Sequence, residues 1–193
     1  MLNISDADKD LWRSGLTKKE LIIIFPGLNL TLTNSDIYHE SLELTESIES
    51  NKNLSFEGCI ASKLKISLIN FTRDVRNEYL EVSMQTIDGS IVSAPIPLFS
   101  GYVADQSNTN HEDFITTLTC YDPLKKALDA DVYNWYNSLV FPMTIKTLRD
   151  SFFLQFGIIQ DSSNLANDTL TINKSIDDTS ILGRDILKWI CQI

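Results

Sequence analysis

Serine and cysteine hydrolases need a histidine base beside the nucleophile, and this chain contains two histidines, His39 and His111. His39 stands between Tyr38 and Glu40 in a charged segment, and His111 stands in a polar segment. The sequence has no Gly-x-Ser-x-Gly elbow, which exposes the nucleophile in many hydrolases. We therefore interpret both histidines as exposed structural residues and predict no catalytic residue.

Acidic residues at alternate positions can ligate calcium, as Asp6, Asp8 and Asp10 would. The rest of a calcium loop does not follow, because Leu11 stands where the loop needs glycine and Thr17 where it needs glutamate. Acids in the first turn of a helix are stabilising, so we interpret these aspartates as the start of a short helix. No metal-binding or cofactor-binding residue is predicted.

Paired carboxylates can serve as acid and base in a glycosidase, and Glu43 with Glu46 or Asp129 with Asp131 would be candidates. Acid pairs are also abundant on exposed faces, so spacing alone favours a solvated role for them. A carboxylate hydrolase is kept as an alternative to a non-enzymatic protein.

Three cysteines, Cys59, Cys120 and Cys191, lie far apart in the sequence without a Cys-x-x-Cys pair. Their odd number and spacing argue against a disulfide framework and a zinc site, so we expect small core residues.

Aromatic residues gather in the segments 133–136 and 152–153. Exposed aromatics would mark a ligand surface, but helical spacing favours core or inter-domain packing, with contact between subunits as an intermediate possibility.

Composition is that of a soluble globular chain, with 43% apolar and 22% charged residues in 193 positions. The longest apolar run, Leu21 to Phe25, is strand-sized and predicts no membrane span, and the N-terminus lacks the pattern of a secretory signal. We therefore expect synthesis and folding in the cytoplasm. Residues 1–120 carry nine Lys or Arg against seventeen Asp or Glu, so specific nucleic-acid binding is not expected.

From about residue 19 to 122, apolar residues alternate with polar ones, which predicts half-buried strands. Turn signals separate these segments, and Asp88-Gly89 is the clearest hairpin tip. Pro95 and Pro97 predict a sheet edge or a strand beginning near Leu98. The alternating positions include Leu28, Leu30, Leu32, Leu42, Leu44, Leu64, Ile66, Leu68, Leu80, Val82, Met84, Leu118 and Cys120. We therefore predict six or more antiparallel strands arranged as a sandwich or barrel.

Helices are expected at both ends of the chain. Ser5 with Asp8 resembles a capping pair, and Gly15 can end that short helix. The segments 131–139 and 144–156 have helical periodicity, with Thr144 as a cap and Gly157 as a left-handed stop. A short strand at 170–172 and a last helix from about Ser180 follow. That helix carries an apolar side, Ile186, Leu187, Trp189 and Ile190, which needs a partner.

The order of these segments resembles prophage tail proteins of the baseplate-hub family from Gram-positive bacteria. The similarity lies in the runs 34–48, 54–62, 97–103, 119–122, 131–136, 147–153 and 181–190, and covers nearly the whole chain from about Lys19. One departure is Glu57, which stands between Phe56 and Gly58 and could mark a bulge.

The resemblance implies a structural, non-enzymatic tail-tip hub, with barrel-like domains forming a ring, usually a trimer, at the end of the tail tube. Implied partners are other tail proteins of the tube, distal tail and tip, without a cofactor. The implied location is the virion tail, and the host bacterial cytoplasm during assembly. It also implies that such chains often continue into further hub domains, in agreement with the apolar last helix.

The fold class expected is α+β, mainly β, with an antiparallel β-barrel or sandwich followed by a small helical segment. We expect a helical arm over 1–18, a β-rich domain over 19–128, and an α-rich segment over 129–193 that begins a second hub domain. Two alternative functions stay open: a tail-associated cell-wall hydrolase, and a carbohydrate-binding or host-receptor module.

Overall fold

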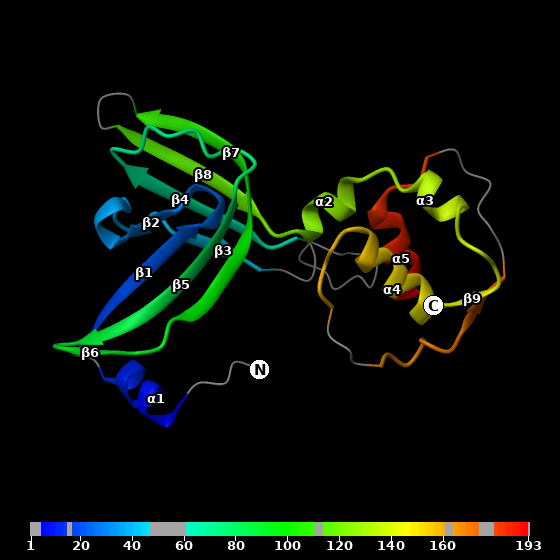
Figure 1. Ribbon diagram of the computed structural model, residues 1–193, viewed down its shortest axis with the longest axis horizontal. Coiled ribbons are helices and arrows are strands. Elements are labelled where there is room, and N and C mark those ends of the chain that lie inside the picture. Colours follow the sequence, from blue (N-terminus) through cyan, green and yellow to red (C-terminus); the bar gives the residue numbers. More distant parts are fainter. Residues whose placement is uncertain are drawn as a thin grey trace. The chain divides into compact units, whose positions relative to one another are not determined.

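The computed structural model describes residues 5–14, 17–46, 61–110, 114–160, 164–173 and 180–192. These residues form two compact units (Figure 1). The first contains the described residues of Met1–Thr45 and Lys63–Asp122, and the second contains those of Glu46–Ser62 and Pro123–Ile193. The expectations about His111, Cys59, Gly15 and the Glu57 bulge lie outside the described residues.

The first unit is an eight-stranded antiparallel sheet with a short helix, α1 (Asp6–Arg13). Its strands pair in the order β2-β1-β5-β7-β8-β4-β3, and β6 pairs with the end of β5. The strands are β1 (Lys18–Phe25), β2 (Leu30–Thr33), β3 (Glu43–Thr45), β4 (Lys63–Ile69), β5 (Tyr79–Asp88), β6 (Ile91–Val92), β7 (Ile96–Asn110) and β8 (Ile115–Tyr121). Two 3₁₀ turns, η1 (Pro26–Leu28) and η2 (Asn34–Asp36), flank β2.

Alternation along the strands places the core on one face of this sheet. Leu64, Ile66 and Leu68 of β4 are buried, and Cys120 and Leu118 of β8 lie opposite Leu64 and Ile66 in register. The same cluster contains residues of β1, β2, β5 and β7: Ile23, Phe25, Leu32, Leu80, Val82, Phe99 and Val103. Most of the alternating positions read from the sequence are therefore core positions, because a strand turns every second side chain to the same face.

The α+β, mainly β class expected from the sequence is confirmed, but the sheet is not closed into a barrel. In the described ranges, β2 and β3 are its two edges. The chain nevertheless crosses from one edge toward the other, because Ile37, just after η2, bridges Leu68 of β4. The result is a curved, sandwich-like sheet that wraps its core without a continuous ring of strand pairs.

Local turn chemistry accounts for the central strands. The hairpin expected at Asp88-Gly89 joins β5 to β6, and Gly89 has a φ of +58°, which favours glycine. The expectation for Pro97 is confirmed: β7 begins at Ile96, and β8 pairs with it only from Tyr102, so within the described residues Pro97 lies where the sheet has a local edge. Proline is tolerated there because the pairing with β5 shifts at a bulge between Val82 and Ser83, opposite Pro97.

Helix α1 begins with the Ser5–Asp8 capping pair that the sequence predicted. The hydroxyl of Ser5 accepts a hydrogen bond from the backbone N–H of Asp8 at 3.1 Å and donates to its carboxylate at 2.7 Å. Asp6 and Asp8 lie in the first turn, where the helix dipole favours negative charge. A second carboxylate oxygen of Asp8 accepts from the N–H of Ala94 at 3.3 Å, which ties α1 to the segment after β6.

The second unit is mainly helical. It contains α2 (Leu124–Asp129), α3 (Tyr133–Asn137), α4 (Ile145–Gln155) and α5 (Gly183–Gln192), with the two-stranded pair β9 (Met143–Thr144) and β10 (Thr171–Ile172). Thr144 caps α4 by accepting from the N–H of Thr147, and Gly157 has a φ of +64°, as the sequence predicted. None of the helices in the described ranges is long and apolar enough to cross a membrane.

Candidate recognition site at the end of the sheet

The candidate site lies where the long strand β7 extends beyond its neighbour β5. β5 pairs with β7 only as far as Tyr79 opposite Tyr102, whereas β8 pairs with β7 from Tyr102 to Asn110. The loop from β4 to β5, residues 70–78, runs beside the extension. Its start is fixed by the N–H of Asn70, which donates to the carbonyl of Phe114 at 3.0 Å.

Gln106 of β7 holds this loop with its side-chain amide. Its Oε1 accepts from the N–H of Val75 at 2.9 Å, and its Nε2 donates to the carbonyl of Arg73 at 2.9 Å. Val75 is fully buried, so these bonds fix a loop residue inside the core cluster. Arg76 adds a bond from Nη2 to the carbonyl of Gln106 at 3.2 Å and pairs with Asp74 at 3.1 Å.

The other end of the site is built around Thr116 of β8. Its hydroxyl donates to the carbonyl of Phe71 at 2.7 Å and lies 3.0 Å from Oδ1 of Asn108. Phe71 packs against the core cluster, whereas Phe114 is 62% exposed. Phe114 also has a φ of +49°, which is unusual for an aromatic residue.

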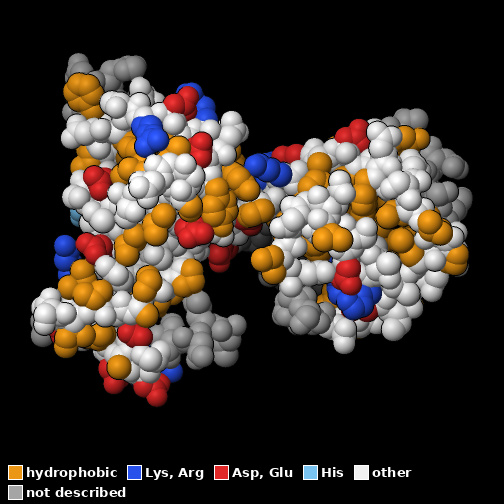
Figure 2. Space-filling model, viewed as in Figure 1, with side chains coloured by type: hydrophobic (Ala, Val, Ile, Leu, Met, Phe, Trp, Pro, Cys, Tyr) orange, Lys and Arg blue, Asp and Glu red, His pale blue; other side chains and the backbone are white. Residues whose placement is uncertain are grey.

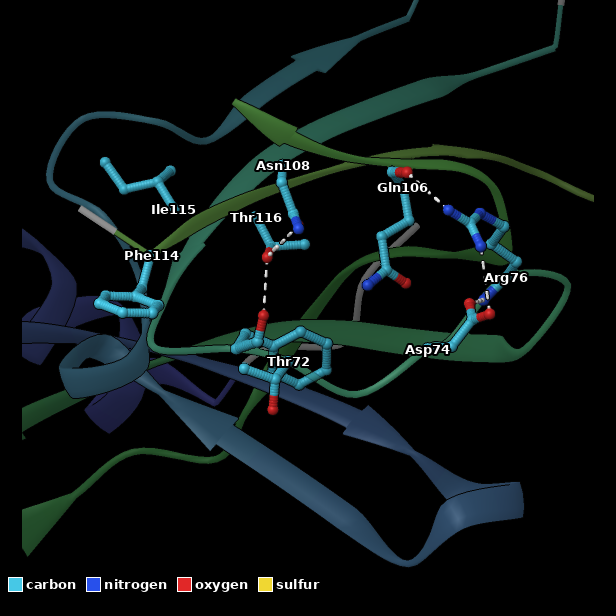
Figure 3. Close-up of a pocket in the computed structure, with 9 residues that line it drawn as sticks. Thr72, Asp74, Arg76, Gln106, Asn108, Phe114, Ile115 and Thr116 are labelled. Atoms are coloured by element: carbon cyan, nitrogen blue, oxygen red, sulfur yellow. Dashed lines mark hydrogen bonds and ion pairs between the residues drawn. The ribbon is translucent and has the colours of Figure 1, made fainter. Parts of the chain in front are cut away.

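These groups line a hollow of about 640 Å³ (Figure 3). Figure 3 shows the pair Asp74 and Arg76 at one end, and Phe114 and Ile115 at the other. The lining contains neither a histidine nor a cysteine, and its carboxylate, Asp74, is already paired with Arg76. The arrangement offers hydrogen-bonding groups and aromatic walls, which suit recognition of a ligand rather than bond cleavage.

Of the carboxylates that could have served a hydrolase, Asp129 and Asp131 have other partners and Glu43 is exposed. The Oδ2 atom of Asp129 lies 2.6 Å from Nζ of Lys125, and the same carboxylate forms an ion pair with Arg184. The hydrogen bond from Lys125 is the main cause that lowers the pKa of Asp129. Asp131 accepts from the N–H of Tyr133 at 2.9 Å. In the other pair, Glu43 lies exposed on the edge strand β3.

The remaining candidates are distributed through both units. The side chain of His39 is 89% exposed, as predicted. Asp6 pairs with Lys9 and Asp10 with Arg13 along α1. Within the described ranges, no three His, Cys, Asp or Glu side chains gather where they could hold a metal ion.

The cysteines divide between core and surface. Cys120 is fully buried, and burial raises the pKa of its thiol to about 12. The expectation of a core position was wrong for Cys191, which is exposed. It follows Ile190 on α5, so the helix turns it away from the buried face.

The aromatic residues of the second unit pack against one another, as the sequence favoured. Tyr136 and Phe152 are buried, and the ring of Trp135 lies edge-on to Phe152 at 5.6 Å between centroids. Tyr136 contacts Trp189 of α5 in the same manner at 6.3 Å. The cluster is thus the core of this unit rather than an exposed ligand platform.

No family model matches the chain, and no curated protein matches it. Among solved structures, it is similar to the crystal structure of the 43 kDa tail protein of prophage MuSo2 from Shewanella oneidensis, with a TM-score of 0.55 and 12% sequence identity. The match covers 91% of this chain and 50% of that protein, so the chain spans half its length. At this identity the likeness shows a shared fold.

Proposed function

We propose that this chain is a structural, non-enzymatic component of a bacteriophage or prophage tail, which assembles as part of a ring-shaped baseplate hub at the end of the tail tube. The observation that carries the proposal is the shared fold with the MuSo2 tail protein, which extends over 91% of the chain and therefore includes both units. The resemblance of the sequence runs to tail-hub proteins points in the same direction.

Physical features of the surface suit assembly into a ring. An edge strand presents unpaired backbone groups, and the first unit has two such edges, β2 and β3, in its described residues. Exposed apolar side chains occur in each unit, among them Ile91 and Val92 on β6, Leu154 near the end of α4, and Ile159 beyond it. Figure 2 shows apolar side chains on the visible surface of both units. A closed heterologous ring would cover edges and apolar groups of this kind.

The proposed partners are further copies of the chain, forming a trimer or another ring, and other tail proteins of the tube, distal tail and tip. The proposed place of action is the virion tail, after assembly in the host bacterial cytoplasm. No role in catalysis is proposed, because the carboxylates considered for a hydrolase have other partners or lie exposed on an edge strand.

Immunogold electron microscopy of tails purified from an induced lysate tests this function. Antibody against the chain is expected to label the tail tip, while antibody against a capsid protein labels the head as a control. Unlabelled tails in a lysate that contains the free chain would contradict a structural role. Clearing of host cell walls by the purified chain would favour the hydrolase alternative.

A further inference from the structure

The outer edge of β7, beyond its pairing with β5, is only partly covered by the loop 70–78. Val103 uses both backbone groups on this loop, because its N–H donates to the carbonyl of Glu78 at 3.0 Å and its carbonyl accepts from Asn77 at 2.8 Å. Farther along, the carbonyl of Gln106 accepts from the side chain of Arg76. The loop therefore replaces a neighbouring strand as far as Gln106.

Strand geometry decides which groups lie past that point. A bulge between Val103 and Asp105 shifts the pairing with β8, and the register then continues without a break from Gln106 to Asn108. Residues of an antiparallel strand alternate between bonding to one neighbour and facing away from it. Because Gln106 faces the loop, Asn108 also directs its N–H and C=O away from β8. Neither group has a partner among the described residues.

The hollow in Figure 3 adjoins this edge. Phe71 and Ile115 supply apolar walls, and Phe114 stands exposed at the rim. The left-handed backbone of Phe114 would suit glycine better, and strained residues of this kind concentrate at binding sites. The backbone edge can therefore supply main-chain hydrogen bonds, while the walls can receive a side chain.

We propose that this hollow binds an extended, uncharged peptide segment of a partner protein, which adds to β7 as a further strand and inserts an apolar side chain between Phe71 and Phe114. Recognition of this kind takes its affinity from main-chain hydrogen bonds and its specificity from side-chain pockets. The proposal goes beyond the ring assembly proposed above and does not depend on it.

The charges of the residues that line the hollow indicate the charge of the peptide that it binds. Asp74 and Arg76 neutralise each other, and the other lining residues carry no charge. The chain as a whole has a formal charge of −10, which disfavours an acidic segment. A charged side chain placed between the aromatic walls would lose hydration without gaining a partner, so an uncharged segment fits best.

The test is a titration of the full chain, labelled with ¹⁵N, with a capped library of uncharged hexapeptides in which Phe, Leu or Val alternates with Ser or Thr. We expect amide shifts to concentrate at Gln106, Asn108 and Phe114. Phe114→Gly should weaken the apparent affinity at least about tenfold, because it removes the rim aromatic. Phe114→Tyr should retain binding, since it keeps the ring.

Stability separates loss of the site from loss of the fold. Glycine is suited to a φ of +49°, so Phe114→Gly should leave the melting temperature unchanged or raised. Val140→Ser, which changes an exposed apolar residue of the second unit, should leave peptide binding unchanged.

The proposal would be overturned by no amide shifts at millimolar peptide, by shifts centred elsewhere, or by equal binding of the Phe114→Gly variant. Shifts of the same amides with rising protein concentration and without peptide would assign the edge to a second copy, and would also overturn it. Ring assembly is measured separately by solution mass, so either proposal can fail alone.

Discussion

Asp168→Asn should destabilise the second unit strongly, because it breaks a buried ion pair. Asp168 accepts two bonds from Arg149, from Nη1 at 2.6 Å and from Nη2 at 3.3 Å. The side chains are 8% and 6% exposed for Arg149 and Asp168, so neither charge is well hydrated. Asparagine can still accept the N–H of Leu165, which lies 2.8 Å from Oδ2, so the substitution removes little more than the charge.

The expected loss in the free energy of unfolding depends on which carboxylate remains near Arg149. Removing one partner of a buried pair costs about 3–5 kcal/mol, since the other charge is left without compensation. Asp150 lies 3.9 Å from Nε of Arg149 and offers a weak substitute, which places the expected loss near the lower end, about 3 kcal/mol. Replacing both charges, as in Arg149→Met with Asp168→Asn, should cost only about 1 kcal/mol.

Tryptophan fluorescence during urea unfolding measures this loss. Trp135 and Trp189 report on the second unit, where their rings contact Phe152 and Tyr136. Trp12 lies on α1 of the first unit, so Trp12→Phe removes the other source of signal. The midpoints in this background give the free energy of unfolding of the second unit.

Two results would contradict a penalty from the uncompensated charge of Arg149. A loss of less than about 1 kcal/mol for Asp168→Asn would mean that Arg149 is well hydrated or finds another partner. An equal loss in the double variant would mean that packing, rather than uncompensated charge, is responsible.

Further predictions concern reactivity, packing and pH. Because the pKa of the Cys120 thiol is about 12, only about one in ten thousand of these thiols is ionised at pH 8. Iodoacetamide should therefore modify Cys191 and spare Cys120 in the native chain, which peptide mass mapping would measure. Gly101→Ala should cost about 3 kcal/mol or more in urea unfolding, because its Cβ would lie 2.2 Å from a backbone oxygen of β8. Because the pKa of Asp129 is lowered in the folded chain, its ionised carboxylate stabilises the fold above about pH 4, and this stability is lost as the pH falls through the folded-state pKa. Lys125→Met should make the free energy of unfolding depend less on pH between pH 6 and pH 2.

Much of the fold could be predicted because local chemistry and tertiary structure agree. The alternation that buries Leu64, Ile66 and Leu68 is visible without partners, and it places β4 correctly. Thr144 and Gly157 mark the ends of α4 through capping, which depends on the nearest residues alone. Closure of the sheet could not be predicted, since pairing of edge strands depends on curvature accumulated over all strands.

The candidate site gave no comparable signal. Gln106 resembles any polar strand residue in the sequence, and its role depends on contacts with a loop about thirty residues earlier. The positive φ of Phe114 could not be predicted from the sequence, because aromatic residues seldom adopt it. Arg149 offered a clue that was missed: it lies four residues after Ile145, on the buried side of α4, where a charge needs a partner.

The solution mass of the chain, measured by light scattering over a wide range of concentrations, tests the proposed hub role most directly. One copy has a mass of 21.8 kDa. We expect a discrete species of three or six copies that persists on dilution and loses copies when charges are introduced at Ile91 and Val92. A single copy at every concentration would contradict assembly into a ring by this chain.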